Sequence, residues 1–111
     1  MNDQSKSVKF ATMTILHASN ARRFISDAYK ELSEFRFDSA REKIKGAREE
    51  TLFAHREQSK IIQSESDGDS LEFSLLLTHA QDTLMSAVSE MYIAKNLITI
   101  VEKIYLDNHR E

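Results

Sequence analysis

The stretch from Leu71 to Tyr105 constrains the fold most, because it is apolar on two sides of one predicted helix. A helix turns by about 100° per residue, so residues three and four positions apart share a face. The first apolar face is wide enough to line a core. It consists of Phe73, Leu77, Ala80, Leu84, Ala87, Met91, Ala94 and Ile98. We expect this face to pack inside the chain's own fold.

The second apolar face lies about 140° around the helix axis from the first. It consists of Leu75, Ile93, Leu97, Ile100 and Ile104. Its N-terminal half also holds Asp82, with Ser86 nearby and His79 at its edge. One helix with two apolar faces needs two surfaces to pack against. We therefore expect the second face to contact other copies of this chain.

The composition indicates an all-α chain. There is no proline, and the only glycines are Gly46 and Gly68, so few residues interrupt helices. We predict helices over about 5–32, 39–66 and 70–106, within one domain over 1–111. The second helix is predicted to begin with a capping box from Ser39 to Glu42, or with Asp38 as the cap. A short link around Gly68 makes the helices antiparallel, which gives an up-down-up three-helix bundle.

The charge pattern and the termini exclude several classes of protein. The net charge is −3 and no basic run is present, which argues against binding to nucleic acid. The chain has no cysteine, its N-terminus lacks the apolar core of a signal peptide, and no uncharged apolar run approaches the ~20 residues of a membrane span. We expect a cytoplasmic protein.

Each of the first two predicted helices has a seam of inward residues at three- and four-residue spacing. In the first helix the seam is Val8, Ala11, Ile15, Ala18, Ile25, Tyr29 and Leu32. Arg22 falls on that seam, and we interpret it as an ion-paired or snorkelling side chain rather than as a phosphate clamp. In the second helix the seam is Ala40, Ile44, Ala47, Thr51, Ala54 or His55, Gln58, Ile62 and Glu65.

His79 and Asp82 are the main candidates for chemistry. They are three residues apart, so their side chains are neighbours on the helix surface. The simplest interpretation is a partly buried histidine beside a solvated carboxylate. However, an unpaired carboxylate in an apolar interface costs several kcal/mol. Asp82 is therefore either exposed, or shared between symmetric copies that bind one hard cation such as Mg²⁺.

The second helix offers supporting residues for this site. Folding the chain back at Gly68 places Gln58 level with His79, and His55 level with the turn after Asp82. His55 is interpreted as a core or interface histidine near His79. The spacing of these residues does not fit a zinc site, and the chain has no glycine-rich phosphate loop.

The run from His79 to Met85, His-Ala-Gln-Asp-Thr-Leu-Met, resembles the active-histidine motif of a known family. This family is the enzyme IIA component of the lactose/cellobiose branch of the bacterial sugar phosphotransferase system. The resemblance extends to Ala54–Ser59, followed by Glu65 and Gly68, and to Asn20–Arg22. It therefore spans most of the chain in the same order. Thr83 departs from the pattern, because many members carry a second histidine at this position.

The resemblance implies a homotrimer of three-helix subunits. It implies that His79 is transiently phosphorylated on Nε2, and that Asp82 from three subunits holds one Mg²⁺ ion. Gln81 would orient the site beside them. The phosphoryl group would come from the phosphocarrier protein HPr and pass to a cysteine of enzyme IIB, which supplies a membrane permease. The membrane would be contacted only through that permease.

Two other classes of function compete with this hypothesis. The first is a non-catalytic helical scaffold that uses the third helix only for assembly. The second is a histidine phosphotransfer domain, which is disfavoured because Thr78-His79-Ala80 lacks the lysine and glycine that usually flank its histidine. The sequence leaves the sugar open among lactose, cellobiose and chitobiose.

Overall fold

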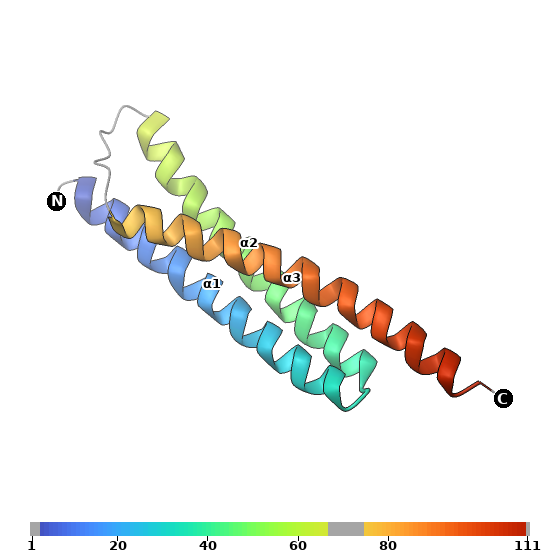
Figure 1. Ribbon diagram of the computed structural model, residues 1–111. Helices are drawn as coiled ribbons and strands as arrows, with labels where there is room; N and C mark the ends of the chain where they lie inside the picture. Colours follow the sequence, from blue (N-terminus) through green and yellow to red (C-terminus); the bar gives the residue numbers. More distant parts are fainter. Residues whose placement is uncertain (1–2, 67–74, 111) are drawn as a thin grey trace.

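The computed structural model describes residues 3–66 and 75–110 and shows three long helices (Figure 1). They are α1 (Asp3–Ser33), α2 (Phe37–Ser66) and α3 (Leu75–Asn108). The helices run up, down and up, and the rod measures 67 × 19 × 18 Å. No strand occurs among the described residues. The predicted all-α antiparallel three-helix bundle is thereby confirmed.

Where the structure describes them, the helix bounds lie within two residues of the predicted ones. α2 begins at Phe37, so Ser39 lies inside the helix and the predicted cap at Ser39 or Asp38 is wrong. α1 ends one residue later than predicted, and α3 ends at Asn108, two residues later. The predicted break around Gly68 and the start of the third helix at residues 70–74 lie outside the described residues.

The turn between α1 and α2 explains the early start of α2. Phe35 has a φ of 60°, the left-handed conformation that usually follows a helix end. The Arg36 N–H donates to the Glu31 carbonyl at 3.0 Å, and the Phe35 N–H donates to the Leu32 carbonyl at 2.9 Å. These two bonds form a Schellman motif, which stops α1 and reverses the chain at once. The Phe35 ring stacks on Tyr105 of α3, with 4.7 Å between ring centroids.

The core-facing side of α1 is made mainly of small residues. It consists of Ala11, Thr14, Ala18, Ala21, Ile25, Ala28 and Leu32, all buried. The predicted seam shares four of these positions, but its other residues do not face the core. Val8 and Tyr29 are 52% and 38% exposed, and Ile15 is half-buried. Small side chains allow the helices to approach closely, so Thr14, Ala21 and Ala28 face the core in place of their larger neighbours.

The buried face of α2 agrees with its predicted seam. Its buried residues are Ala40, Ile44, Ala47, Thr51 and Ala54. Ala54, rather than His55, therefore takes the inward position. His55 is exposed, so its interpretation as a core histidine is wrong, whereas an interface role stays a prediction. Gln58 is half-buried, whereas the Ile62 and Glu65 side chains lie outside the described part of the chain.

Gly46 allows α1 and α2 to pack closely. A Cβ atom at this position would lie 2.7 Å from Cε1 of the Phe24 ring in α1. Only glycine leaves room for the ring in its present position. The absence of a side chain therefore has a packing reason, which offsets the low helix propensity of glycine.

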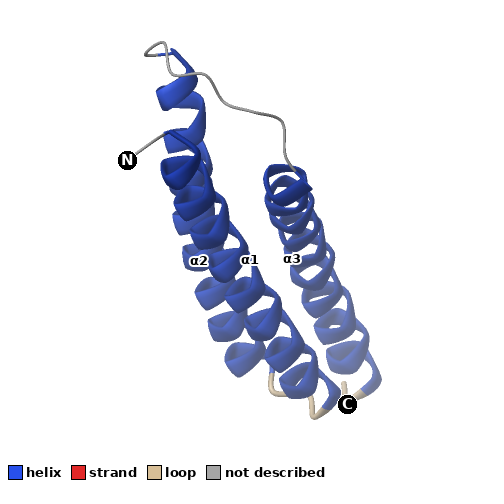
Figure 2. Cartoon of the chain, turned by 90° about the vertical axis from the view of Figure 1, so that its left-hand side faces the viewer, coloured by secondary structure: helices blue, strands red, loops and turns tan. Residues whose placement is uncertain are grey.

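The inner face of α3 completes the core as predicted. Its buried residues include Ala80, Leu84, Ala87, Met91, Ala94 and Ile98. Leu77 is half-buried, and Phe73 lies outside the described residues. α1 and α2 form the most extensive contact, and α3 packs more against α1 than against α2 (Figure 2).

Two bidentate ion pairs join α3 to the other helices. Arg22 of α1 donates to both carboxylate oxygens of Glu90, at 2.9 and 3.0 Å. Arg41 of α2 pairs in the same way with Glu102. The hydrogen bonds from Arg41 lower the pKa of the Glu102 carboxyl. The interpretation of Arg22 as an ion-paired residue is confirmed.

Candidate functional site

His79 lies near the N-terminus of α3, at the end of the rod where α1 begins (Figure 1). Its side chain is exposed, as are those of Gln81 and Asp82. The three-residue spacing puts His79 and Asp82 on neighbouring parts of the helix surface. Among the described residues, neither side chain has a hydrogen-bond or ion-pair partner. The imidazole is therefore accessible to a macromolecule that approaches from outside.

Thr83 lies behind this surface rather than on it. Its side chain is buried, and its hydroxyl donates to the backbone carbonyl of His79 at 2.7 Å. A threonine hydroxyl commonly makes this bond to the preceding turn of a helix. Thr83 thus supports the backbone at His79 and does not offer a side chain to a reacting group there.

The expected supporting residues on α2 differ in exposure. His55 is exposed and Gln58 is half-buried. Neither makes a hydrogen bond with His79 within the described part of the chain, so their supporting role stays a prediction. Arg22 has no such role: its partner Glu90 comes 11 residues after His79, about 16 Å further along the helix.

Asp82 lies on the side of α3 that continues toward the C-terminus as the second apolar face. The second apolar face of α3 is uncovered in the single chain: Leu75 is 83% exposed, and Ile93, Ile100 and Ile104 are each more than half exposed. Leu97 is 37% exposed. A row of large apolar side chains of this kind marks an interaction surface. We call it the outer face of α3.

The outer face also explains the overall hydropathy of α3. By length and composition alone, α3 is apolar enough to cross a membrane, and 22% of its most apolar window is buried. One helix of this kind is a weak indication, because a helix in a protein core passes the same test. The two apolar faces account for the composition of α3.

The described residues of a single chain supply too few ligands for a metal ion. Within residues 3–66 and 75–110, no group of three histidine, cysteine, aspartate or glutamate residues could hold one. The exposed Asp82 carboxylate has the oxygen chemistry that Mg²⁺ prefers.

Comparison with known proteins agrees with the three-helix fold. The family model for the lactose/cellobiose-specific IIA subunit of the PTS system matches residues 9–102. The lichenan-specific phosphotransferase enzyme IIA component of Bacillus subtilis (strain 168) is 36% identical over 104 residues, covering 94% of this chain and 93% of that protein. The oligo-beta-mannoside-specific EIIA component of the same organism is 37% identical over 86 residues, or 78% of each chain.

A crystal structure shows the same architecture. The PTS cellobiose-specific enzyme IIA from Bacillus anthracis matches with a TM-score of 0.84 and 32% identity, over 95% of this chain and 94% of that one. These proteins define a class, the sugar-specific IIA components of the phosphotransferase system. Within that class, the chain belongs to the lactose/cellobiose-specific enzyme IIA family. It is a phosphotransferase component of a sugar transport system.

Proposed function

We propose that this chain is a phosphocarrier that accepts a phosphoryl group from HPr on His79 and passes it to the cysteine of enzyme IIB. The observation that carries the proposal is the exposed His79 imidazole, which sits in the seven-residue motif of a chain of this family. A carrier must exchange its group with two proteins in turn, and this requires an accessible side chain.

The chemistry needs few protein groups. A neutral imidazole has a free ring nitrogen, Nε2 in this proposal, that attacks the phosphorus while the bond to HPr breaks. The cysteine sulfur of enzyme IIB then attacks the same phosphorus, and the bond to His79 breaks. Phosphoryl transfer asks the protein mainly for positioning and charge stabilisation. We propose that Gln81 orients the reacting groups, and that His55 and Gln58 are further candidates for this role.

We further propose that the chain works as a homotrimer joined by the outer face of α3. Three Asp82 carboxylates would then meet at the symmetry axis, where their mutual repulsion needs a counter-charge. One Mg²⁺ ion would be held there by these carboxylates, with water completing its shell. When bound, the ion supplies charge neutralisation and plays a structural role.

The proposed partners also indicate where in the cell this chain works. HPr and enzyme IIB deliver and remove the group in the cytoplasm, and the chain meets the membrane only through the permease. We propose a sugar of the lactose, cellobiose or chitobiose type. The permease, rather than this chain, selects among them.

Incubation with phosphorylated HPr, followed by measurement of intact mass, tests the carrier role. We expect one phosphoryl group per chain on the wild type and on His109→Gln, a matched control at the far end of the rod. His79→Gln should take none while its helical circular dichroism is unchanged. An acid-labile, base-stable group on His79→Gln would contradict the assignment. A wild type that assembles but takes no group from any phosphorylated donor would instead be a helical scaffold.

A further inference from the structure

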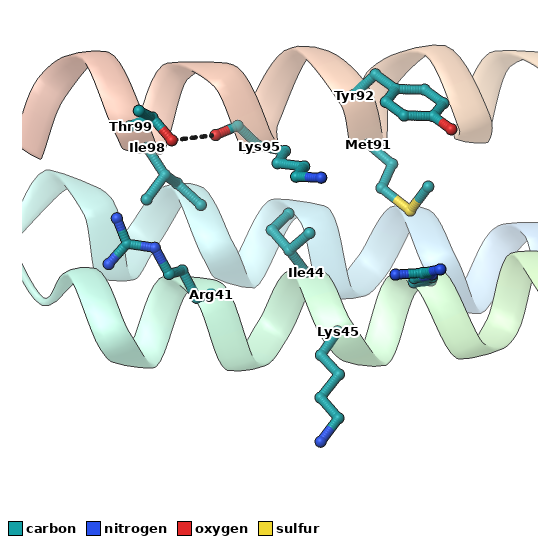
Figure 3. Close-up of a pocket in the computed structure, with 9 residues that line it drawn as sticks. Arg41, Ile44, Lys45, Met91, Tyr92, Lys95, Ile98 and Thr99 are labelled. Carbon is teal, nitrogen blue, oxygen red and sulfur yellow. Dashed lines mark hydrogen bonds between the residues drawn. The ribbon is translucent and has the colours of Figure 1, made fainter.

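A pocket of about 410 Å³ lies between α2 and α3, in the half of the rod away from His79 (Figure 3). Its apolar wall is formed by Ile44, Met91 and Ile98, and Tyr92 lies at one end. This volume falls within the range of small-molecule sites. The pocket therefore has room for a ligand with an apolar or ring-shaped body.

The charged residues that line the pocket all have the same sign. They are Arg41, Lys45, Arg48 and Lys95, although the whole chain carries a net charge of −3. Within residues 3–66 and 75–110, no carboxylate lines the pocket. These cations come from two helices that are distant in sequence, so no basic run marks the pocket in the sequence. A cleft lined by one sign of charge concentrates ions of the opposite sign.

The four cations are not equivalent. Glu102 holds Arg41 in a bidentate pair. Figure 3 shows Lys45 pointing away from α3, whereas Lys95 extends into the space between α3 and α2. In the described part of the chain, Arg48 and Lys95 have no ion-pair partner. They are therefore the two cations from opposite walls whose charge is available to a ligand.

We propose that this pocket binds a small organic phosphate, with Arg48 and Lys95 on its phosphate group and its carbon body against Tyr92 and Met91. Arginine binds phosphate through two parallel hydrogen bonds, and lysine adds a compact charge. An organic body gains the apolar wall, which inorganic phosphate cannot use. Binding also relieves the repulsion between the lining cations.

This site is separate from His79. Lys95 comes 16 residues after His79 on one helix, which places it about 24 Å further along the axis. The proposal therefore does not depend on the phosphocarrier role, and either one can fail alone. A second copy of this chain is the competing occupant, because Tyr92 is adjacent to Ile93 of the outer face.

Binding of glucose 6-phosphate to the full chain, measured by calorimetry at low ionic strength, tests the site. We expect saturable binding of glucose 6-phosphate, weaker binding of inorganic phosphate and none of glucose. The double variant Arg48→Gln/Lys95→Gln should lose at least about tenfold in affinity. The control Lys43→Gln/Lys103→Gln removes the same charge from the same two helices outside the pocket, and it should bind as the wild type does.

Four results would overturn the proposal. One is the absence of binding to the wild type. Another is an equal loss of affinity in both double variants, which would indicate general charge attraction. Unchanged affinity in Arg48→Gln/Lys95→Gln would place the ligand elsewhere. A change in the assembly mass of that variant alone would make the pocket an interface between copies.

Discussion

Phe35 shows how one residue sets the connection between two helices. It adopts a left-handed backbone conformation, which costs a residue with a side chain about 1 kcal/mol or more. Glycine is the usual residue at this position of a helix end. The stacking of its ring on Tyr105 gives a reason for a phenylalanine here, because the turn is thereby anchored to α3.

Two substitutions separate these effects at Phe35. Both Phe35→Ala and Phe35→Gly remove the stacked ring, but only glycine relieves the positive φ. We expect Phe35→Gly to be more stable than Phe35→Ala by about 1 kcal/mol. Urea unfolding followed by circular dichroism measures the difference. Equal stability of the two variants would show that the backbone conformation carries no cost.

The candidate site illustrates what the sequence reveals at the scale of single residues. His79 and Asp82 can be selected from their spacing and motif, and both side chains are exposed. Their roles as phosphate carrier and interface residue stay predictions. The role of Thr83 could not be predicted, because a hydroxyl serves a reacting group and a backbone carbonyl equally well. Only the fold shows that it donates to the His79 carbonyl.

At the scale of helices, the sequence predicts α3 better than α1. In α3, polar residues separate two apolar faces, so periodicity identifies its inner face. In α1, Ala11, Ala18, Ile25 and Leu32 are buried as the periodicity predicts, but the remaining apolar members of the predicted seam are not: Val8, Ile15 and Tyr29. Periodicity favoured large residues such as Ile15 and Tyr29, whereas close packing selects small ones such as Ala21 and Ala28. The sequence does not predict the start of α2, because no glycine marks the preceding turn.

Gly46 allows a direct test of close packing between α1 and α2. Gly46→Ala gains about 1 kcal/mol of helix propensity but forces a Cβ atom into the Phe24 ring. We expect a net loss of about 1 kcal/mol in the wild-type background. In the Phe24→Ala background the space is open, so the same change should stabilise the chain.

Thermal unfolding of the four proteins in this double-mutant cycle gives the coupling between the two positions. A Gly46→Ala change that stabilises both backgrounds equally would show that the ring does not require the glycine.

At the scale of the whole molecule, the chain is more extended than a compact domain. Its radius of gyration is 17.8 Å, whereas a compact domain of this length has about 13 Å. A thin rod buries little core for its length. The exposed outer face of α3 offers the further burial that association would provide. The sequence indicates this face, but the number of copies comes only from family resemblance.

In the proposed trimer, Asp82 would link the assembly to the metal ion. In the proposed trimer, Asp82→Leu removes three like charges from the axis and adds apolar surface. We expect this variant to keep or strengthen the assembly while it loses the bound divalent cation. Native mass spectrometry reports both properties at once. An Asp82→Leu protein that still carries the ion would remove Asp82 from the proposed site.

The same measurement on the purified wild type, in dilute buffer with Mg²⁺, tests the central claim most directly. That claim is that α3 packs one apolar face inside the chain and the other against copies of itself. We predict a mass of three chains with one divalent cation. A single chain without metal, with the outer face of α3 open to solvent, would contradict it.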